Sequence, residues 1–296
     1  RLKVFGEEEM EVKIVLFDEV LEHILRIDRI LKQPLGHALL VGTSGSGKTM
    51  LSRFVAWLNN MTAFQIKVHR HYSAADFDKD LRSLLIRAGV QGEKICFIFD
   101  ESNAVSTAFL ERMNCLLASG DVPGLFEGTD YTALLADCKD QARKANWPLP
   151  ATSSPAAAEA ALYKAFVTNI QRNLPVVFTM NPADKDFDNR AATSPALFNR
   201  CVTNWMGEWS SGALTQVANE YLKAVDLGAL VEYARHLGEV DGEESLRGLQ
   251  EDRVRAGLVS LMVHVHESVA ALCRRVARRQ QGRTTYVTPR HFLDVI

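Results

Sequence analysis

A glycine-rich octapeptide constrains this chain more than any other feature. Residues 42–49 have the sequence Gly-Thr-Ser-Gly-Ser-Gly-Lys-Thr and match the pattern G-x-x-x-x-G-K-[ST]. An apolar run, residues 37–41, precedes them, and a helical pattern with Leu51, Phe54 and Val55 on one face follows. This order predicts a buried strand, a tight loop and a helix. Glycines let such a loop curl until its N–H groups, with the helix N-terminus, can surround phosphate oxygens.

Further apolar or alternating segments predict the rest of a sheet. They cover residues 64–68, 95–99, 176–178 and 201–206. Helical patterns separate them, which favours right-handed βαβ units and a central parallel sheet. From residue 213 onward only helical patterns remain, among them one at 254–278. We therefore predict an α/β domain over residues 1–210 and an all-α unit over residues 211–296, with a surface insertion at 144–161.

Composition excludes several classes of protein. The chain has 296 residues and a net charge of −2, which argues against non-specific binding of nucleic acid. It lacks a run of 18 apolar residues, so we expect no membrane-spanning helix. Its five cysteines form no C-x-x-C pair, so neither a disulfide framework nor a zinc site is expected. The chain opens without Met and stops within a helical pattern, so we expect it to be part of a longer polypeptide.

An acidic pair at the end of the strand at 95–99 supplies a second signal. In this interpretation Asp100 and the hydroxyl of Thr49 hold Mg²⁺, and Lys48 contacts the β- and γ-phosphates. Glu101 then polarises the attacking water as a general base. The alternative is an acidic pair that only favours a helix N-terminus.

Three other polar residues each have a functional and a structural interpretation. Asn181 follows an apolar strand and could bind the γ-phosphate, or it could only form a turn with Pro182. Arg200 ends a short helical segment and could recognise a triphosphate or form a surface salt bridge. Arg290 lies in the first turn of a helix that Thr288 caps, where it needs a charged partner or is exposed.

Two histidines suggest a metal site only weakly. His69 and His71 follow the strand predicted at 64–68 and would share one strand face, at positions i and i+2. A third ligand is not visible in the sequence, so a structural role is the better interpretation.

Several segments together resemble the dynein heavy chain family, and within it the fourth AAA+ module of the cytoplasmic type. The resemblance covers nearly the whole chain and is thin at 142–165 and 228–256. The segments that carry it are residues 16–20, 42–49, 51–57, 64–70, 100–103, 190–201 and 288–292.

The resemblance implies an AAA+ P-loop fold, in which a large α/β subdomain binds ATP and a small helical lid covers it. It makes Glu101, Asn181 as sensor I and Arg200 as arginine finger the catalytic residues, with Thr49 and Asp100 on Mg²⁺. Residues 113–134 would form a hairpin insertion. The resemblance also implies an adenine pocket lined by Val15, Leu16 and Phe17, and a sensor II role for Arg290. The implied nucleotide-binding residues are Leu16, Phe17, Gly42, Thr43, Ser44, Gly45, Ser46, Gly47, Lys48, Thr49, Met50 and Arg290.

The implied function is that of an ATPase module in a cytoplasmic, microtubule-associated motor. Its partners would be neighbouring AAA+ modules of the same chain, the microtubule indirectly through a stalk, and intermediate and light chains of the complex. Arg200 would serve the nucleotide of the preceding module, and the module would regulate the motor. Two alternatives stay open: a module that holds nucleotide without turnover, and another AAA+ remodelling ATPase.

Overall fold

The computed structural model describes residues 2–8, 14–100, 107–149, 154–184, 195–229, 247–279 and 287–296. The chain divides into two compact units, each of which is described by itself. The sheet unit comprises Glu22–Gly42 and Gly47–Met206. The helical unit comprises Arg1–Leu21, Thr43–Ser46 and Gly207–Ile296. It therefore includes an N-terminal segment and four loop residues that the predicted division at residue 210 does not assign to it.

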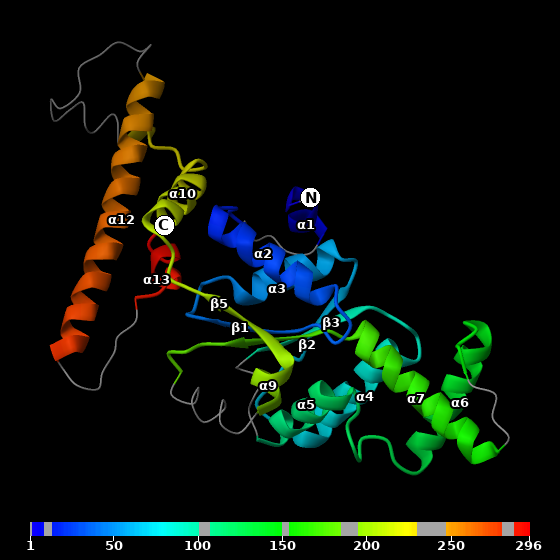
Figure 1. Ribbon diagram of the computed structural model, residues 1–296. Helices are drawn as coiled ribbons and strands as arrows, with labels where there is room; N and C mark the ends of the chain where they lie inside the picture. The colour runs from blue at the N-terminus through cyan, green and yellow to red at the C-terminus, as the bar shows by residue number, and fades with distance from the viewer. Residues whose placement is uncertain are drawn as a thin grey trace. The chain divides into compact units, whose positions relative to one another are not determined.

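The sheet unit is built on five parallel strands, as the sequence predicts. They are β1 (His37–Gly42), β2 (Thr62–Gln65), β3 (Ile95–Asp100), β4 (Val176–Met180) and β5 (Cys201–Met206). Their order is β2-β3-β4-β1-β5, so β1 lies between β4 and β5 (Figure 1). The three inner strands are apolar and almost wholly buried, as expected of a parallel sheet with both faces covered.

Helices cover both faces of this sheet. On one side lie α2 (Asp18–Leu31) and α3 (Lys48–Leu58), and on the other α4 (Ala74–Gly89), α5 (Thr107–Ser119) and α7 (Pro155–Asn173) (Figure 1). Because side chains alternate along a strand, every second strand residue faces each layer. The second face carries the main apolar core, which includes Leu39, Phe97, Phe99 and Phe178 together with residues of α4, α5 and α7.

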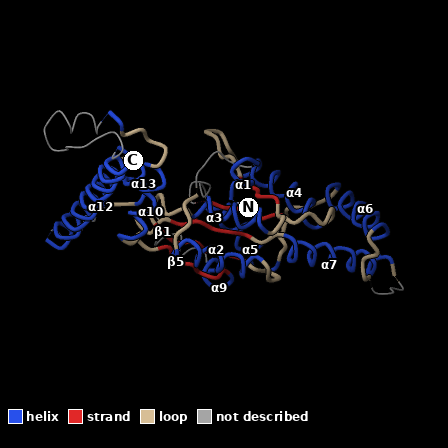
Figure 2. The backbone as a smooth tube through the Cα atoms, turned by 90° about the horizontal axis from the view of Figure 1, so that it is seen from above, coloured by secondary structure: helices blue, strands red, loops and turns tan. Residues whose placement is uncertain are grey.

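The hairpin predicted at residues 113–134 is wrong. In this range α5 ends at Ser119 and α6 (Thr129–Lys144) begins, with a loop and no strand between them in the described residues. The loop contains three glycines of positive φ, Gly120, Gly124 and Gly128. Such glycines occur both in hairpin turns and in loops between helices, so they do not distinguish the two. The helix α6 then lies beside α7, as Figure 2 also shows.

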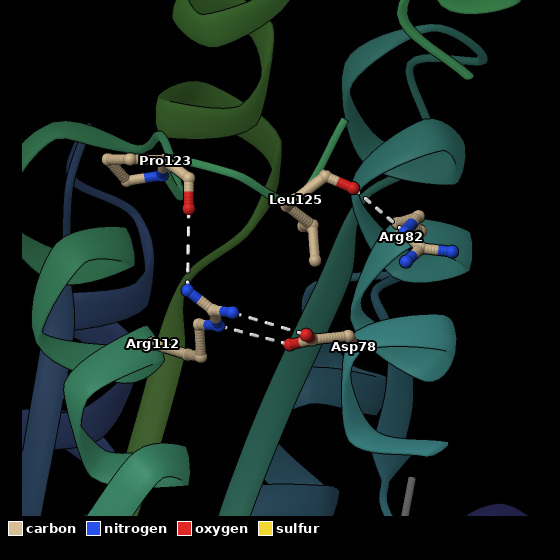
Figure 3. A network of polar contacts seen from close by, with 5 residues as sticks. All are labelled: Asp78, Arg82, Arg112, Pro123 and Leu125. Atoms are coloured by element: carbon tan, nitrogen blue, oxygen red, sulfur yellow. Dashed lines mark hydrogen bonds and ion pairs between the residues drawn. The ribbon is translucent and has the colours of Figure 1, made fainter. Parts of the chain in front are cut away.

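Two arginine side chains donate hydrogen bonds to backbone carbonyls of this loop, which has no strand partner in the part of the chain that the structure describes (Figure 3). Arg82 Nε donates to the carbonyl of Leu125 at 2.8 Å, and an Arg112 guanidinium nitrogen donates to the carbonyl of Pro123 at 3.4 Å. Asp78 accepts two hydrogen bonds from Arg112, at 3.1 and 3.3 Å. Two carbonyls of the loop are thereby satisfied by side chains of α4 and α5.

Two other predicted boundaries differ from the structure. The second strand ends at Gln65, so His69 and His71 lie in a loop, and no group of three metal-ligating residues occurs in the described part of the chain. Within the insertion predicted at 144–161, the alanine-rich part begins α7, with Ser154 accepting a hydrogen bond from the N–H of Ala157. Alanine has the highest helix propensity, so this run forms the first turns of α7 and is not an irregular insertion.

The helical unit contains α1 (Leu2–Glu8), α10 (Ser211–Leu222), α12 (Arg247–Arg279), α13 (Pro289–Leu293) and the short chain around them. Its described residues include no strand, as predicted. The helices α10 and α12 pack side by side (Figure 1). Thr288 is the N-cap of α13 with Pro289 at the first position, which confirms the predicted helix start.

One helix passes a length and composition criterion for crossing a membrane. The Glu251–Arg278 part of α12 is long and apolar enough by length and composition alone, and little of it is buried. Polar residues interrupt this helix, so the absence of an unbroken run of 18 apolar residues did not predict it. A single such helix is weak evidence for a membrane. The apolar residues exposed on α12 are Leu261, Val265, Val269, Leu272 and Val276.

A buried histidine at the start of β1 links two strands. His37 is 3% exposed, and its Nδ1 accepts a hydrogen bond from the N–H of Val176 at 3.0 Å. Burial lowers the pKa of the His37 imidazole to about 4. Protonation at Nδ1 would remove the acceptor that Val176 uses.

We expect this histidine to make the fold sensitive to mild acid. The unfolded chain protonates His37 near pH 6.5 and the folded chain only near pH 4, so stability is lost as pH falls through that window. The loss amounts to about 3 kcal/mol. Urea denaturation at a series of pH values should show a flatter pH dependence for His37→Asn than for the parent. The exposed His69→Asn should match the parent, and equal pH slopes for His37→Asn and the parent would contradict the assignment.

Candidate phosphate-binding site

The glycine loop joins the inner strand β1 to a helix, as its sequence predicts. The strand β1 ends at Gly42 and α3 begins at Lys48. Gly45 and Gly47 have φ angles of 81° and 90°, a region that residues with a Cβ rarely adopt. Gly47 is also the N-cap of α3, so the turn delivers Lys48 and Thr49 directly into the first helical turn.

Lys48 is held in a buried position in the sheet unit. Its side chain donates through Nζ to the carbonyl of Gly42 at 2.7 Å, and the residue is only 9% exposed. Burial of an ammonium group is costly without acceptors, and anionic oxygens are stronger acceptors than a carbonyl. The position therefore suits a lysine that contacts phosphate.

Thr49 and Asp100 meet across the edge of the sheet. The Thr49 hydroxyl donates to a carboxylate oxygen of Asp100 at 3.2 Å, which connects the first turn of α3 with the last residue of β3. Hydroxyl and carboxylate oxygens are hard ligands of the kind Mg²⁺ prefers, so this pair fits the predicted ion. Met50, the next residue of α3, is half-buried.

In the helical unit, the loop packs against the C-terminal helix. A Cβ added to Gly45 would clash with the backbone N of Arg290 and lie 2.7 Å from its Cα, so only glycine fits. Ser46 is 2% exposed, and its hydroxyl has no protein partner in the structure. Such an orphaned hydroxyl in a phosphate-binding loop suits a ligand oxygen. Thr43 is half-buried, and Ser44 is exposed.

The guanidinium of Arg290 has a partner of its own. Arg290 Nε lies 3.0 Å from Asp294 Oδ1, and both side chains are largely exposed. The sequence left a charged partner and an exposed position open as alternatives, and Arg290 shows both, with its partner one helical turn further along the chain. The backbone of Arg290, and not its charge, makes the close approach to the loop.

The other predicted catalytic residues are Asn181, Arg200 and Glu101, and their surroundings in the structure differ. Asn181 follows β4, and its Oδ1 accepts from the N–H of Ala183 at 3.1 Å, so the turn interpretation is realised. Arg200 ends α9 (Pro195–Arg200) and is exposed, directly before β5. Glu101 lies outside the described residues.

The predicted adenine-lining segment has contacts that the sequence did not reveal. Within the helical unit the ring of Phe17 meets Trp209 edge-on, with centroids 5.5 Å apart. Gln216 Nε2 donates to the carbonyl of Leu16 at 2.8 Å, and Val15 is half-buried. Trp209 and Gln216 follow Leu16 by about 200 residues, so no local pattern could have linked them.

A cavity lies next to this cluster in the same unit. It has a volume of about 190 Å³, and Trp209, Leu214, His266 and Pro289 are among its lining residues. Burial lowers the pKa of His266, and the nearby charge of His291 lowers it further. This cavity therefore favours a neutral imidazole beside an indole ring.

The loop, strand and helix define a P-loop α/β fold. Residues 12–296 match the family described as "P-loop containing dynein motor region D4", and the chain belongs to this dynein family. It is 52% identical to the cytoplasmic dynein heavy chain of Dictyostelium discoideum over 304 residues, and 52% identical to that of Drosophila melanogaster over 298 residues. It is 49% identical to dynein heavy chain-like protein 1 of Plasmodium falciparum over 296 residues. Each alignment covers 100% of this chain and 6% of the relative, so the chain spans a small part of these proteins.

Proposed function

We propose that this chain is an ATPase module, the fourth AAA+ module of a cytoplasmic dynein heavy chain. The observation that carries the proposal is the 3.2 Å hydrogen bond between Thr49 and Asp100. It joins a hydroxyl in the first turn of α3 and a carboxylate at the end of β3, the two ligands that P-loop enzymes use for the Mg²⁺ of Mg-ATP. Membership of the dynein motor family supports the same assignment.

The proposed roles follow from residue chemistry. In the sheet unit, Lys48 contacts the β- and γ-phosphates, Thr49 and Asp100 hold Mg²⁺, and Asn181 senses the γ-phosphate after leaving its turn. Bound Mg²⁺ would neutralise charge on the phosphates. Glu101 would accept the proton of the attacking water.

In the helical unit, the proposed contacts to nucleotide come from two segments. Leu16 and Phe17 take the adenine ring, with Trp209 supporting Phe17. Arg290 acts as sensor II, which requires its guanidinium to exchange Asp294 for phosphate. The proposed lid subdomain comprises residues 211–296, and residues 1–210 form the large subdomain.

The position and chemistry of Arg200 support a role between modules. It is exposed at the end of α9, and guanidinium is always charged and suited to phosphate. We propose that it serves the nucleotide of the preceding module, and that a finger from the following module serves this site. The module would regulate a cytoplasmic, microtubule-based motor, which contacts the microtubule through a stalk and assembles with intermediate and light chains.

The isolated chain is expected to bind Mg-ATP and hydrolyse it slowly. Its own site lacks a finger from a neighbouring module, and an arginine finger contributes about 10³–10⁵ in rate. Calorimetry with Mg-ATP and a phosphate-release assay on the same preparation test both parts. Binding without rapid turnover is expected. Absence of any heat at millimolar nucleotide would refute the binding proposal, and turnover equal to that of an assembled ring would refute the role of the finger.

A further inference from the structure

An orphaned hydroxyl lies beside the proposed Mg²⁺ ligands in the sheet unit. Thr179 is 1% exposed, and its Oγ has no hydrogen-bond partner in the structure. Burying a hydroxyl without a partner is unfavourable, and an orphaned polar atom in a folded protein calls for an explanation. In a sheet of apolar strands, valine would fill the same volume without that cost.

The strand register brings Thr179 next to Asp100. The two residues are paired across the parallel strands β3 and β4, so their side chains leave the sheet on the same face. That face is the one α3 covers, because Asp100 accepts a hydrogen bond from Thr49 of α3. Phe99 and Phe178, the neighbours of Asp100 and Thr179 along their strands, belong to the apolar core on the opposite face, which agrees with this placement.

The residue also precedes Asn181 by two positions, and Asn181 directly follows β4. Thr179 is therefore the strand partner of the proposed Mg²⁺ ligand on β3, and it comes two residues before the proposed γ-phosphate sensor that follows β4. No sequence motif for phosphate binding includes this position. Its hydroxyl can act both as donor and as acceptor, and can rotate to suit either.

We propose that Thr179 is a positioning residue for the Mg²⁺ shell, an inference that rests on the proposed function. When the Thr49 hydroxyl binds the ion it releases an oxygen of Asp100. Thr179 Oγ–H then donates to that carboxylate or to a water held by it. The carboxylate keeps a hydrogen bond throughout, so it keeps its orientation toward the ion. The polar residue in the sheet is retained for the loaded state and is unsatisfied in its absence.

The Mg²⁺ dependence of nucleotide binding tests this role. The affinity of the purified chain for a fluorescent ATP analogue is measured in EDTA and over a Mg²⁺ series. Thr179→Val is expected to raise the Mg²⁺ concentration needed for half-maximal binding about 10-fold, because a hydrogen bond to a charged group is lost. Affinity in EDTA should stay unchanged. Thr179→Ser, which keeps the hydroxyl, should behave like the parent, as should Thr203→Val on the exposed part of β5.

The outcomes separate this inference from the proposed function. If the parent binds the analogue with Mg²⁺ and Thr179→Val has the same Mg²⁺ dependence, the inference is wrong while the proposed function stands. A higher melting temperature for Thr179→Val with an unchanged Mg²⁺ titration would identify the hydroxyl as a structural defect. If the parent shows no Mg²⁺-dependent binding, both are overturned. Thr179→Ala serves as a second variant if the valine does not fold, with the same expected shift.

Discussion

Replacing Lys48 by alanine is expected to lower the affinity of the chain for Mg-ATP about 100-fold. The ammonium group lies at the start of α3, and its charge-assisted hydrogen bonds to phosphate are each worth about 1.5–3 kcal/mol. The substitution also removes the 2.7 Å hydrogen bond to the carbonyl of Gly42. Calorimetry with Mg-ATP measures the effect directly.

A matched variant separates phosphate binding from general loss of positive charge. Lys67→Ala removes the same charge at an exposed position and should leave the affinity unchanged. Thermal unfolding of both variants checks that the fold is retained. Equal affinity of Lys48→Ala and the parent would show that the glycine loop does not bind the triphosphate, and the proposed function would fail.

Replacing Glu101 by glutamine is expected to slow γ-phosphate release about 10²–10⁴-fold while nucleotide still binds. Glutamine keeps the size of the side chain and removes its capacity to accept a proton from water. Single-turnover release of labelled phosphate, measured beside the binding affinity, separates chemistry from binding.

The control for this variant is Glu111→Gln on the exposed face of α5, which should release phosphate like the parent. Equal release from the parent and Glu101→Gln would favour the alternative, a module that holds nucleotide without turning it over. Loss of binding in Glu101→Gln would instead assign the carboxylate to the structure of the site.

The strands could be predicted because burial on both faces leaves a simple pattern. Apolar runs identify β1, β3 and β4 without any knowledge of their partners. The loop at residues 120–128 could not be predicted in the same way. Its conformation depends on Arg82 and Arg112, which reach its carbonyls from α4 and α5. Contacts of this kind combine distant positions and leave no periodic signal.

The candidate site likewise contains residues that a contiguous motif predicts and residues that only the folded chain brings together. Lys48 and Thr49 belong to a contiguous motif, so the sequence predicts them and the structure places them in one helical turn. The support of Leu16 by Gln216 and the place of Thr179 beside Asp100 arise only when the chain is folded. Thr179 is recognised by its buried hydroxyl, which has no protein partner among the described residues, and not by any motif.

The strand order has a consequence for how this polypeptide is made. Of the four neighbouring pairs in the sheet, β2–β3 and β3–β4 join consecutive strands, whereas β1 pairs only with β4 and β5, which follow much later in the chain. His37 of β1 and Val176 of β4, which bond to each other, are 139 residues apart. At about 5–20 residues per second, a ribosome takes roughly 7–30 s to cover that distance. During this interval the apolar β1 strand has left the tunnel without its partners, so nascent chains are exposed to misassembly until β4 and β5 emerge.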